Sequence, residues 1–259
     1  LAHDSTIDGS NDRRKEIERI FWDAFLNNYN CTLDTTKPIW EHIWDYYKDI
    51  VIRTKDHPST LGYETINEPF LGTHYITTDF FKRWGNYNTY IANNLRKLTD
   101  KKIFIVESYP SSLDTEVETT HPELVGKSLE YKKAYLTAKY AIPKADNLVF
   151  QVHVYGKNGP TSKDIERIDS YKAFISDGLG IPIIVGEWTE LEPTNGDVEP
   201  SVSLFNRYLQ EFSKRGFGWF YFRYDPTESW SIKANQAGYP DRVLSDGTTI
   251  RDIFLQLLY

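Results

Sequence analysis

Two glutamates, each directly after a short apolar run, are the residues best placed to do chemistry in this sequence. Glu68 stands in Asn67-Glu68-Pro69 after the run Leu61–Ile66, and Glu187 follows the run Ile181–Val185 closely. Apolar runs of this length are typical of buried strands. Two carboxylates can cleave a glycosidic bond, because one protonates the leaving oxygen while the other attacks the anomeric carbon. We therefore interpret Glu68 as a general acid/base and Glu187 as a nucleophile.

The elements that must position these glutamates alternate between strand and helix. Five apolar runs have the composition of buried strands: Leu61–Ile66, Lys102–Glu107, Leu148–Val154, Ile181–Val185 and Gly218–Phe222. Stripes at helical spacing lie between them, as in Phe80–Leu98 and Leu204–Phe212. The strand starts are about 35–45 residues apart, a spacing typical of βα units. The pattern predicts an α/β fold with five of the eight strands of a β/α barrel, whose catalytic groups lie at C-terminal strand ends.

The segments before and after these five strand–helix units do not follow the same alternation of strand and helix. Helices are predicted over Arg14–Phe25 and Ile39–Ile52, and no strand candidate precedes them. Residues Leu1–Asn11 have a loop composition, and Ile250–Leu258 has the pattern of a closing helix. We expect one catalytic domain over residues 1–259, complete at its C-terminal end and lacking the first three barrel strands.

Composition excludes several classes of function. The net charge is -7 and the basic residues are scattered, so the sequence offers no basic face for a nucleic acid. No apolar stretch approaches the roughly 20 residues needed to span a bilayer. The single Cys31 has no cysteine partner for a disulfide or a zinc cluster. We predict no metal and no cofactor.

Four elements in order give the chain a family resemblance: Asn67-Glu68-Pro69, His153-Val154-Tyr155, Gly186-Glu187-Trp188 and Gly218–Asp225. They resemble glycoside hydrolase family 5, the cellulase family, where such elements end barrel strands four, six, seven and eight. The resemblance implies a (β/α)8 barrel of which strands 4 to 8 are readable here. It also implies a retaining endo-β-glycosidase without a cofactor, secreted from the cell.

The same resemblance implies roles for the residues around the glutamates. Asn67 would bind the 2-hydroxyl of the reacting sugar, Tyr155 would donate a hydrogen bond to the nucleophile, and His153 would line the cleavage subsite. Strand alternation places His153 and Tyr155 on one face. At the eighth strand Phe222 takes the place of the family's usual Trp, so Trp219 or Trp230 is an alternative source of an aromatic floor under the sugar.

Two family residues have no counterpart in this sequence. The family uses an Arg on an early strand and a His near the third strand, and the surroundings of His3 show no strand. A barrel without its first strands would expose open sheet edges, which proteins normally avoid. One hypothesis is a separate N-terminal segment that completes the barrel, and another is that the sequence is a partial one.

The substrate class stays open at the level of sequence. An oligo- or polysaccharide is expected, with β-1,4-glucan first, β-mannan next and a glycolipid glycan as an alternative. The loops Tyr109–Lys127 and Leu191–Pro200 would shape the cleft. The sequence of a loop does not show which sugar it contacts. A different hypothesis is a non-catalytic carbohydrate-binding or assembly protein derived from such a hydrolase.

Overall fold

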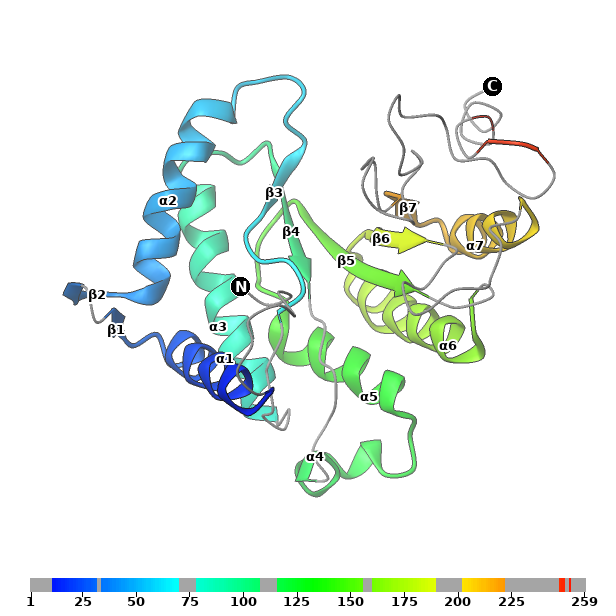
Figure 1. Cartoon of the computed structure of the whole chain (residues 1–259), viewed down its shortest axis with the longest axis horizontal. Coiled ribbons are helices and arrows are strands. Elements are labelled where there is room, and N and C mark those ends of the chain that lie inside the picture. Colours follow the sequence, from blue (N-terminus) through cyan, green and yellow to red (C-terminus); the bar gives the residue numbers. More distant parts are fainter. Residues whose placement is uncertain are drawn as a thin grey trace. The chain divides into compact units, whose positions relative to one another are not determined.

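The computed structural model describes residues 11–31, 34–69, 78–107, 116–155, 160–189, 202–221, 247–249 and 252 (Figure 1). The chain divides into two compact units, Leu1–Val149 and Phe150–Tyr259. The prediction of a single catalytic domain over residues 1–259 stays a prediction.

The first unit combines helices with two pairs of short strands. Its elements are α1 (Asn11–Leu26), β1 (Asn30–Cys31), β2 (Asp34–Pro38), α2 (Ile39–Thr54), β3 (Gly62–Glu64), α3 (Thr78–Arg96), β4 (Ile103–Glu107), α4 (Glu116–Thr120), η1 (Pro122–Leu124), α5 (Leu129–Leu136) and η2 (Thr137–Ala141). Strand β3 pairs with β4 in parallel, as βα units require. The antiparallel pair β1–β2 lies between the two predicted helices and was not expected from the sequence.

Helix α3 is a main contributor to the apolar core of the first unit. The predicted stripe is buried from Phe80 to Leu95, and α3 runs beside α2 (Figure 1). Trp84 stacks on Tyr87 with ring centroids 5.3 Å apart, and Phe25 of α1 packs against Tyr87 at 4.8 Å. Burial raises the pKa of Tyr87. Offset and tilted ring pairs of this kind stabilise a core beyond the area that they bury.

A glycine lets α3 approach the π-helical turn η2 closely. A Cβ at Gly85 would lie 1.9 Å from the carbonyl oxygen of Tyr140, so only glycine fits there. One turn further along, Asn88 Nδ2 donates to the carbonyl of Ala141 at 2.9 Å. Because the last carbonyls of a helix have no partner within it, this amide stabilises the end of η2.

The second unit is a parallel sheet with helices between its strands. Its elements are β5 (Leu148–Tyr155), which begins at the end of the first unit, α6 (Ser162–Tyr171), η3 (Lys172–Asp177), β6 (Ile183–Thr189), α7 (Val202–Arg215) and β7 (Gly218–Trp219). Strand β6 pairs in parallel with β5 and with β7 (Figure 1). A capping box of Thr161 and Asp164 starts α6.

Trp188 forms the centre of the core between β6 and α7. Its side chain is fully buried, and its ring lies 4.9 Å from Phe205, 5.4 Å from Tyr208 and 5.4 Å from Phe212. The helical spacing of these three residues on α7 was the basis for predicting this helix, and the helix is confirmed.

Strand and helix identities agree with the sequence, whereas several boundaries do not. Strand β3 ends at Glu64, so Glu68 lies in the segment after the strand and not at its last residue. Strand β6 continues to Thr189, so Glu187 lies inside it. Asn11 belongs to α1 and not to a loop. These boundaries were wrong because apolar runs do not show where pairing with a neighbour stops.

Some predictions concern residues outside the described ranges. They include the loop Leu1–Ser10 with His3, the closing helix Ile250–Leu258 and the loop Leu191–Pro200. Among the helices that the structure describes, none is long and apolar enough to cross a bilayer.

Candidate active site

Glu68 lies in the first unit, on the segment that follows β3. Its φ is +44°, in the left-handed region, and Pro69 comes directly after it. A non-glycine residue in this region costs about 1–3 kcal/mol and persists only when its surroundings hold it. The preceding Asn67 is exposed, whereas Pro69 is buried. Strain of this kind concentrates at functional sites, which agrees with the position of Glu68 in the sequence motif.

A buried glutamate and a partly buried tyrosine hold this segment from neighbouring elements. The main-chain N–H of Glu68 donates to Oε2 of Glu107, the last residue of β4, at 2.7 Å. The hydroxyl of Tyr47 on α2 donates to the carbonyl of Thr65 at 2.8 Å. Burial raises the pKa of Tyr47, so its hydroxyl stays protonated and can donate at neutral pH. Glu107 is itself held, because Trp84 Nε1 donates to its carbonyl at 2.8 Å.

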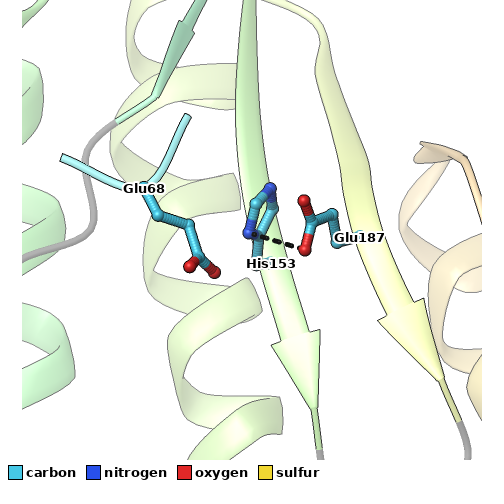
Figure 2. A group of neighbouring side chains, drawn as sticks. All are labelled: Glu68, His153 and Glu187. Carbon is cyan, nitrogen blue, oxygen red and sulfur yellow. Dashed lines mark ion pairs between the residues drawn. The ribbon is translucent and has the colours of Figure 1, made fainter. Parts of the chain in front are cut away.

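The second unit brings Tyr155 and His153 together at the carboxylate of Glu187. The hydroxyl of Tyr155 donates a hydrogen bond to Oε2 of Glu187. Nδ1 of His153 lies 3.5 Å from the same oxygen, and Figure 2 shows this ion pair as a dashed line. His153 and Tyr155 therefore share one face of β5, as strand alternation predicted. The hydrogen bond from Tyr155 and the neighbouring imidazole of His153 hold the carboxylate of Glu187 in place.

The contact with Gln151 determines which ring nitrogen of His153 carries the proton. Nε2 of His153 lies 3.1 Å from Nε2 of Gln151, which is buried on the same strand. An amide nitrogen only donates, so the imidazole nitrogen that it meets accepts. The proton of the neutral ring is then on Nδ1, which faces Glu187. Gln151 thus orients His153 as a donor toward the carboxylate.

A bulge in β6 turns Glu187 toward these donors. Val152 pairs with Val185, but His153 pairs with Glu187, so Gly186 is the extra residue. In an unbroken strand Glu187 would share the face of Val185, whose side chain is fully buried. A bulge shifts this alternation by one residue. Gly186 is required there, because a Cβ would lie 2.1 Å from Cδ of Gln151.

The expected aromatic floor is described only in part. Trp219 on β7 is partly buried and meets Trp188 edge to face, with centroids 5.7 Å apart. One of its edges therefore contributes to the core of the second unit. Phe222 and Trp230 lie outside the described residues, as does the eighth-strand motif beyond Tyr221.

The sequence analysis missed two residues of this site. Glu107 is the last residue of the apolar run Lys102–Glu107, and the other two glutamates come two residues after theirs. Its position at the end of a predicted strand could have identified it. Gln151 lies two residues before His153 in a run that is otherwise apolar except for the histidine. A polar residue inside a buried run indicates a hydrogen-bonded role, because burial without a partner is unfavourable.

The chain is similar to known carbohydrate-active proteins. The model of the family described as cellulase (glycosyl hydrolase family 5) matches residues 16–228. A segment of 97 residues, 38% of the chain, is 33% identical to the beta-mannanase/endoglucanase A of Caldicellulosiruptor saccharolyticus and covers 6% of that protein.

Solved structures with the same fold support this match. The catalytic domain of Thermobifida fusca endoglucanase Cel5A aligns with a TM-score of 0.55 at 15% identity, over 85% of this chain and 64% of that one. The endo-glycoceramidase II of Rhodococcus sp. aligns with a TM-score of 0.58 at 18% identity, over 96% and 52%. The chain spans less than two thirds of the length of each of these relatives. The predicted α/β fold of the (β/α)8 barrel is confirmed, with β3 to β7 in the place of the predicted strands 4 to 8.

Proposed function

The chain belongs to glycosyl hydrolase family 5, the cellulase family, and from this membership we propose that it is an endo-acting β-glycosidase with Glu68 and Glu187 as its catalytic pair. The observation that carries the proposal is the convergence of Tyr155 and His153 on the carboxylate of Glu187. A carboxylate that is held by a hydrogen bond and a neighbouring imidazole has a fixed orientation, which a nucleophile needs.

In the proposed mechanism the two glutamates act in two steps. Glu68 protonates the glycosidic oxygen while a carboxylate oxygen of Glu187 attacks the anomeric carbon, and the bond to the leaving sugar breaks. The contacts with Tyr155 and His153 both use Oε2 of Glu187, and the attacking oxygen in this proposal is Oε1. Glu68 then takes a proton from water, and this water displaces Glu187 from the sugar. Configuration is retained because the anomeric carbon is inverted twice.

The neighbouring residues have supporting roles in this proposal. Asn67 binds the 2-hydroxyl of the reacting sugar, and its exposed side chain is accessible to a ligand. His153 both lines the subsite and orients Glu187. Trp219 and Phe222 contribute to the aromatic floor. These assignments rest on the family motif and, for Asn67 and His153, also on the position of the residue beside a proposed catalytic glutamate.

We propose a β-1,4-linked glucan as the substrate and β-mannan as the next choice. The names of two relatives, beta-mannanase/endoglucanase A and endoglucanase Cel5A, support this choice. A glycolipid glycan is the alternative substrate, because the endo-glycoceramidase II aligns over 96% of this chain. The proposed location is outside the cell, where such polymers are found. Nucleic acid is not a proposed partner.

A separate N-terminal segment is a further proposed partner. Helix α1 exposes three large apolar side chains, with Ile17 61%, Ile20 54% and Phe21 52% accessible. Their spacing places them on one face of the helix, and a contiguous apolar face is typical of an interaction surface. A segment that supplies the early strands of the barrel would also supply the family's missing Arg and His.

A substrate screen with analysis of the first product tests the proposed function. Carboxymethylcellulose, β-mannan and a glucosylceramide-based glycolipid are incubated with the chain, and proton NMR follows the anomer released first. The proposal expects a β-anomer that later mutarotates. An α-anomer as the first product would contradict the double displacement. Binding of these glycans without turnover would favour the non-catalytic alternative.

A further inference from the structure

We propose that Glu107 is a positioning residue that fixes the main chain of Glu68 and thereby aims the acid/base at the glycosidic oxygen. The inference rests on the proposed role of Glu68 and adds a residue that the catalytic motifs do not contain. It is carried by three observations in the first unit: the contact between the two residues, the backbone conformation of Glu68 and the anchoring of Glu107 itself.

The contact is a hydrogen bond to a buried side chain. Oε2 of Glu107 accepts from the main-chain N–H of Glu68 at 2.7 Å, and Glu107 is 2% exposed. Burial of a carboxyl group is unfavourable unless it is hydrogen-bonded. A buried glutamate at the end of β4 therefore indicates a specific task for its carboxylate.

The conformation of Glu68 shows why such a task is needed. A φ of +44° is unfavourable for a residue with a side chain, and the ring of the following Pro69 favours an extended conformation instead. Without a constraint on its amide, Glu68 would relax toward extended backbone and its side chain would point elsewhere. The hydrogen bond to Glu107 acts on the same residue whose φ is unusual, so it opposes this relaxation directly.

Glu107 can act as a fixed reference because its own main chain is anchored. Trp84 Nε1 donates to the carbonyl of Glu107 at 2.8 Å, and Trp84 is 1% exposed. Phe104 and Val106 on the same strand are also buried. An acid/base displaced by about 1 Å can lose up to about 100-fold in rate. A rigid partner for the Glu68 amide therefore has a direct effect on catalysis.

Two conservative substitutions separate position from charge. Glu107→Gln keeps the length of the side chain and an oxygen that can accept the amide, but it removes the charge. Glu107→Asp keeps the carboxylate but shortens the reach by one methylene, about 1.5 Å. The proposal expects Glu107→Gln to behave as wild type and Glu107→Asp to be impaired. A role of the charge alone would give the opposite order.

Leaving-group dependence shows whether the impairment acts through Glu68. Phenyl β-cellobioside needs protonation by the acid, whereas 2,4-dinitrophenyl β-cellobioside leaves without it. In Glu107→Asp, kcat/KM for the phenyl substrate should fall about 10- to 100-fold, with less than about a threefold change for the dinitrophenyl substrate. An equal loss on both substrates, or no loss in Glu107→Asp, would overturn the positioning role.

Glu68→Ala on the same two substrates tests the proposed function separately. If Glu68→Ala shows no leaving-group dependence, or wild type turns over neither substrate, Glu68 is not the acid and the inference falls with that role. If Glu68→Ala shows the dependence but Glu107→Asp does not, only the positioning role is wrong. Glu130→Gln is the matched control, since Glu130 is also buried, at 1% exposure, and 3.3 Å from Lys133. Its substrate ratio should equal that of wild type even if its melting temperature falls.

Discussion

Tyr155 on β5 donates its hydroxyl hydrogen to Oε2 of Glu187 on β6, and Nδ1 of His153 lies 3.5 Å from the same oxygen. The two donors lie two residues apart on one strand, while the acceptor is aimed at them by a bulge in the next strand. This arrangement constrains the carboxylate of Glu187.

Tyr155→Phe should lower kcat/KM by about 10- to 100-fold, because a hydrogen bond to a charged group contributes about 1.5–3 kcal/mol. The melting temperature should change little, since the ring stays in place. Steady-state kinetics on the preferred glycan measures the effect. Tyr171→Phe is the control, because Tyr171 is a buried phenol of the same unit whose ring packs on Phe150. Equal activities in the two variants would argue against the role of Tyr155.

Glu187→Ala and Glu68→Gln should each reduce kcat by at least about 1,000-fold without unfolding the protein, since the first lacks the nucleophile and the second lacks the proton. Kinetics and circular dichroism melts on the same samples measure both quantities. Exposed Glu166 on α6 provides the control Glu166→Ala. Activity near wild type in either catalytic variant would refute the assignment.

Azide distinguishes the roles of the two glutamates. With an activated aryl glycoside, azide should restore turnover of Glu187→Ala with an α-glycosyl azide as product, because azide then replaces the nucleophile. In Glu68→Ala it should give a β-glycosyl azide, because azide then attacks the glycosyl-enzyme. The reverse pattern of products would exchange the two roles.

Gly186→Ala should lower the free energy of unfolding by about 1–3 kcal/mol and reduce activity, because the added Cβ would lie 2.1 Å from Cδ of the buried Gln151. Displacement of Gln151 would also remove the hydrogen bond that orients His153. Urea denaturation and kinetics measure the two effects. Gly218→Ala is the matched control on β7, where a Cβ would meet Ile184 at an ordinary 3.4 Å. A Gly186→Ala variant as stable as this control would contradict the need for glycine in the bulge.

Tyr135→Phe should raise the pKa of Glu123 toward its ordinary value of 4.5. The hydrogen bond from Tyr135 is the main cause that lowers this pKa to about 2, with smaller contributions from the Glu123 amide, His121 and Lys139. Carboxyl carbon NMR titration measures the change. Tyr131→Phe on the same helix should leave the titration unaltered. An unchanged pKa of Glu123 in Tyr135→Phe would show that another group sets it.

The same interaction makes a prediction about stability and pH. A carboxyl group whose folded pKa is depressed stabilises the fold above its unfolded pKa, and this contribution is lost as the pH falls through the folded value. The difference in melting temperature between wild type and Tyr135→Phe should therefore be constant above about pH 4.5 and shrink between 4.5 and about 2. A difference that grows on acidification would contradict the linkage.

The sequence by itself determined the order of the elements and the identity of the proposed catalytic residues. Helix α3 was predictable because its apolar residues recur at helical spacing, and β5 because its run is apolar and rich in valine. Glu68, Glu187, His153 and Tyr155 were identifiable because their types match the chemistry of glycoside cleavage in a known motif order. Such patterns depend only on residues that are close together in the sequence, so the sequence shows them directly.

Only the tertiary structure decided which way these residues point and what holds them. The bulge at Gly186 depends on pairing with β5, and it reverses the face that simple alternation gives to Glu187. The hydrogen bond from Glu68 to Glu107 joins the segment after β3 to the last residue of β4, and helix α3 separates the two in sequence. The left-handed φ of Glu68 is unfavourable in isolation, so no local propensity predicts it. Such features arise from contacts between distant segments, and a pattern within one segment does not contain them.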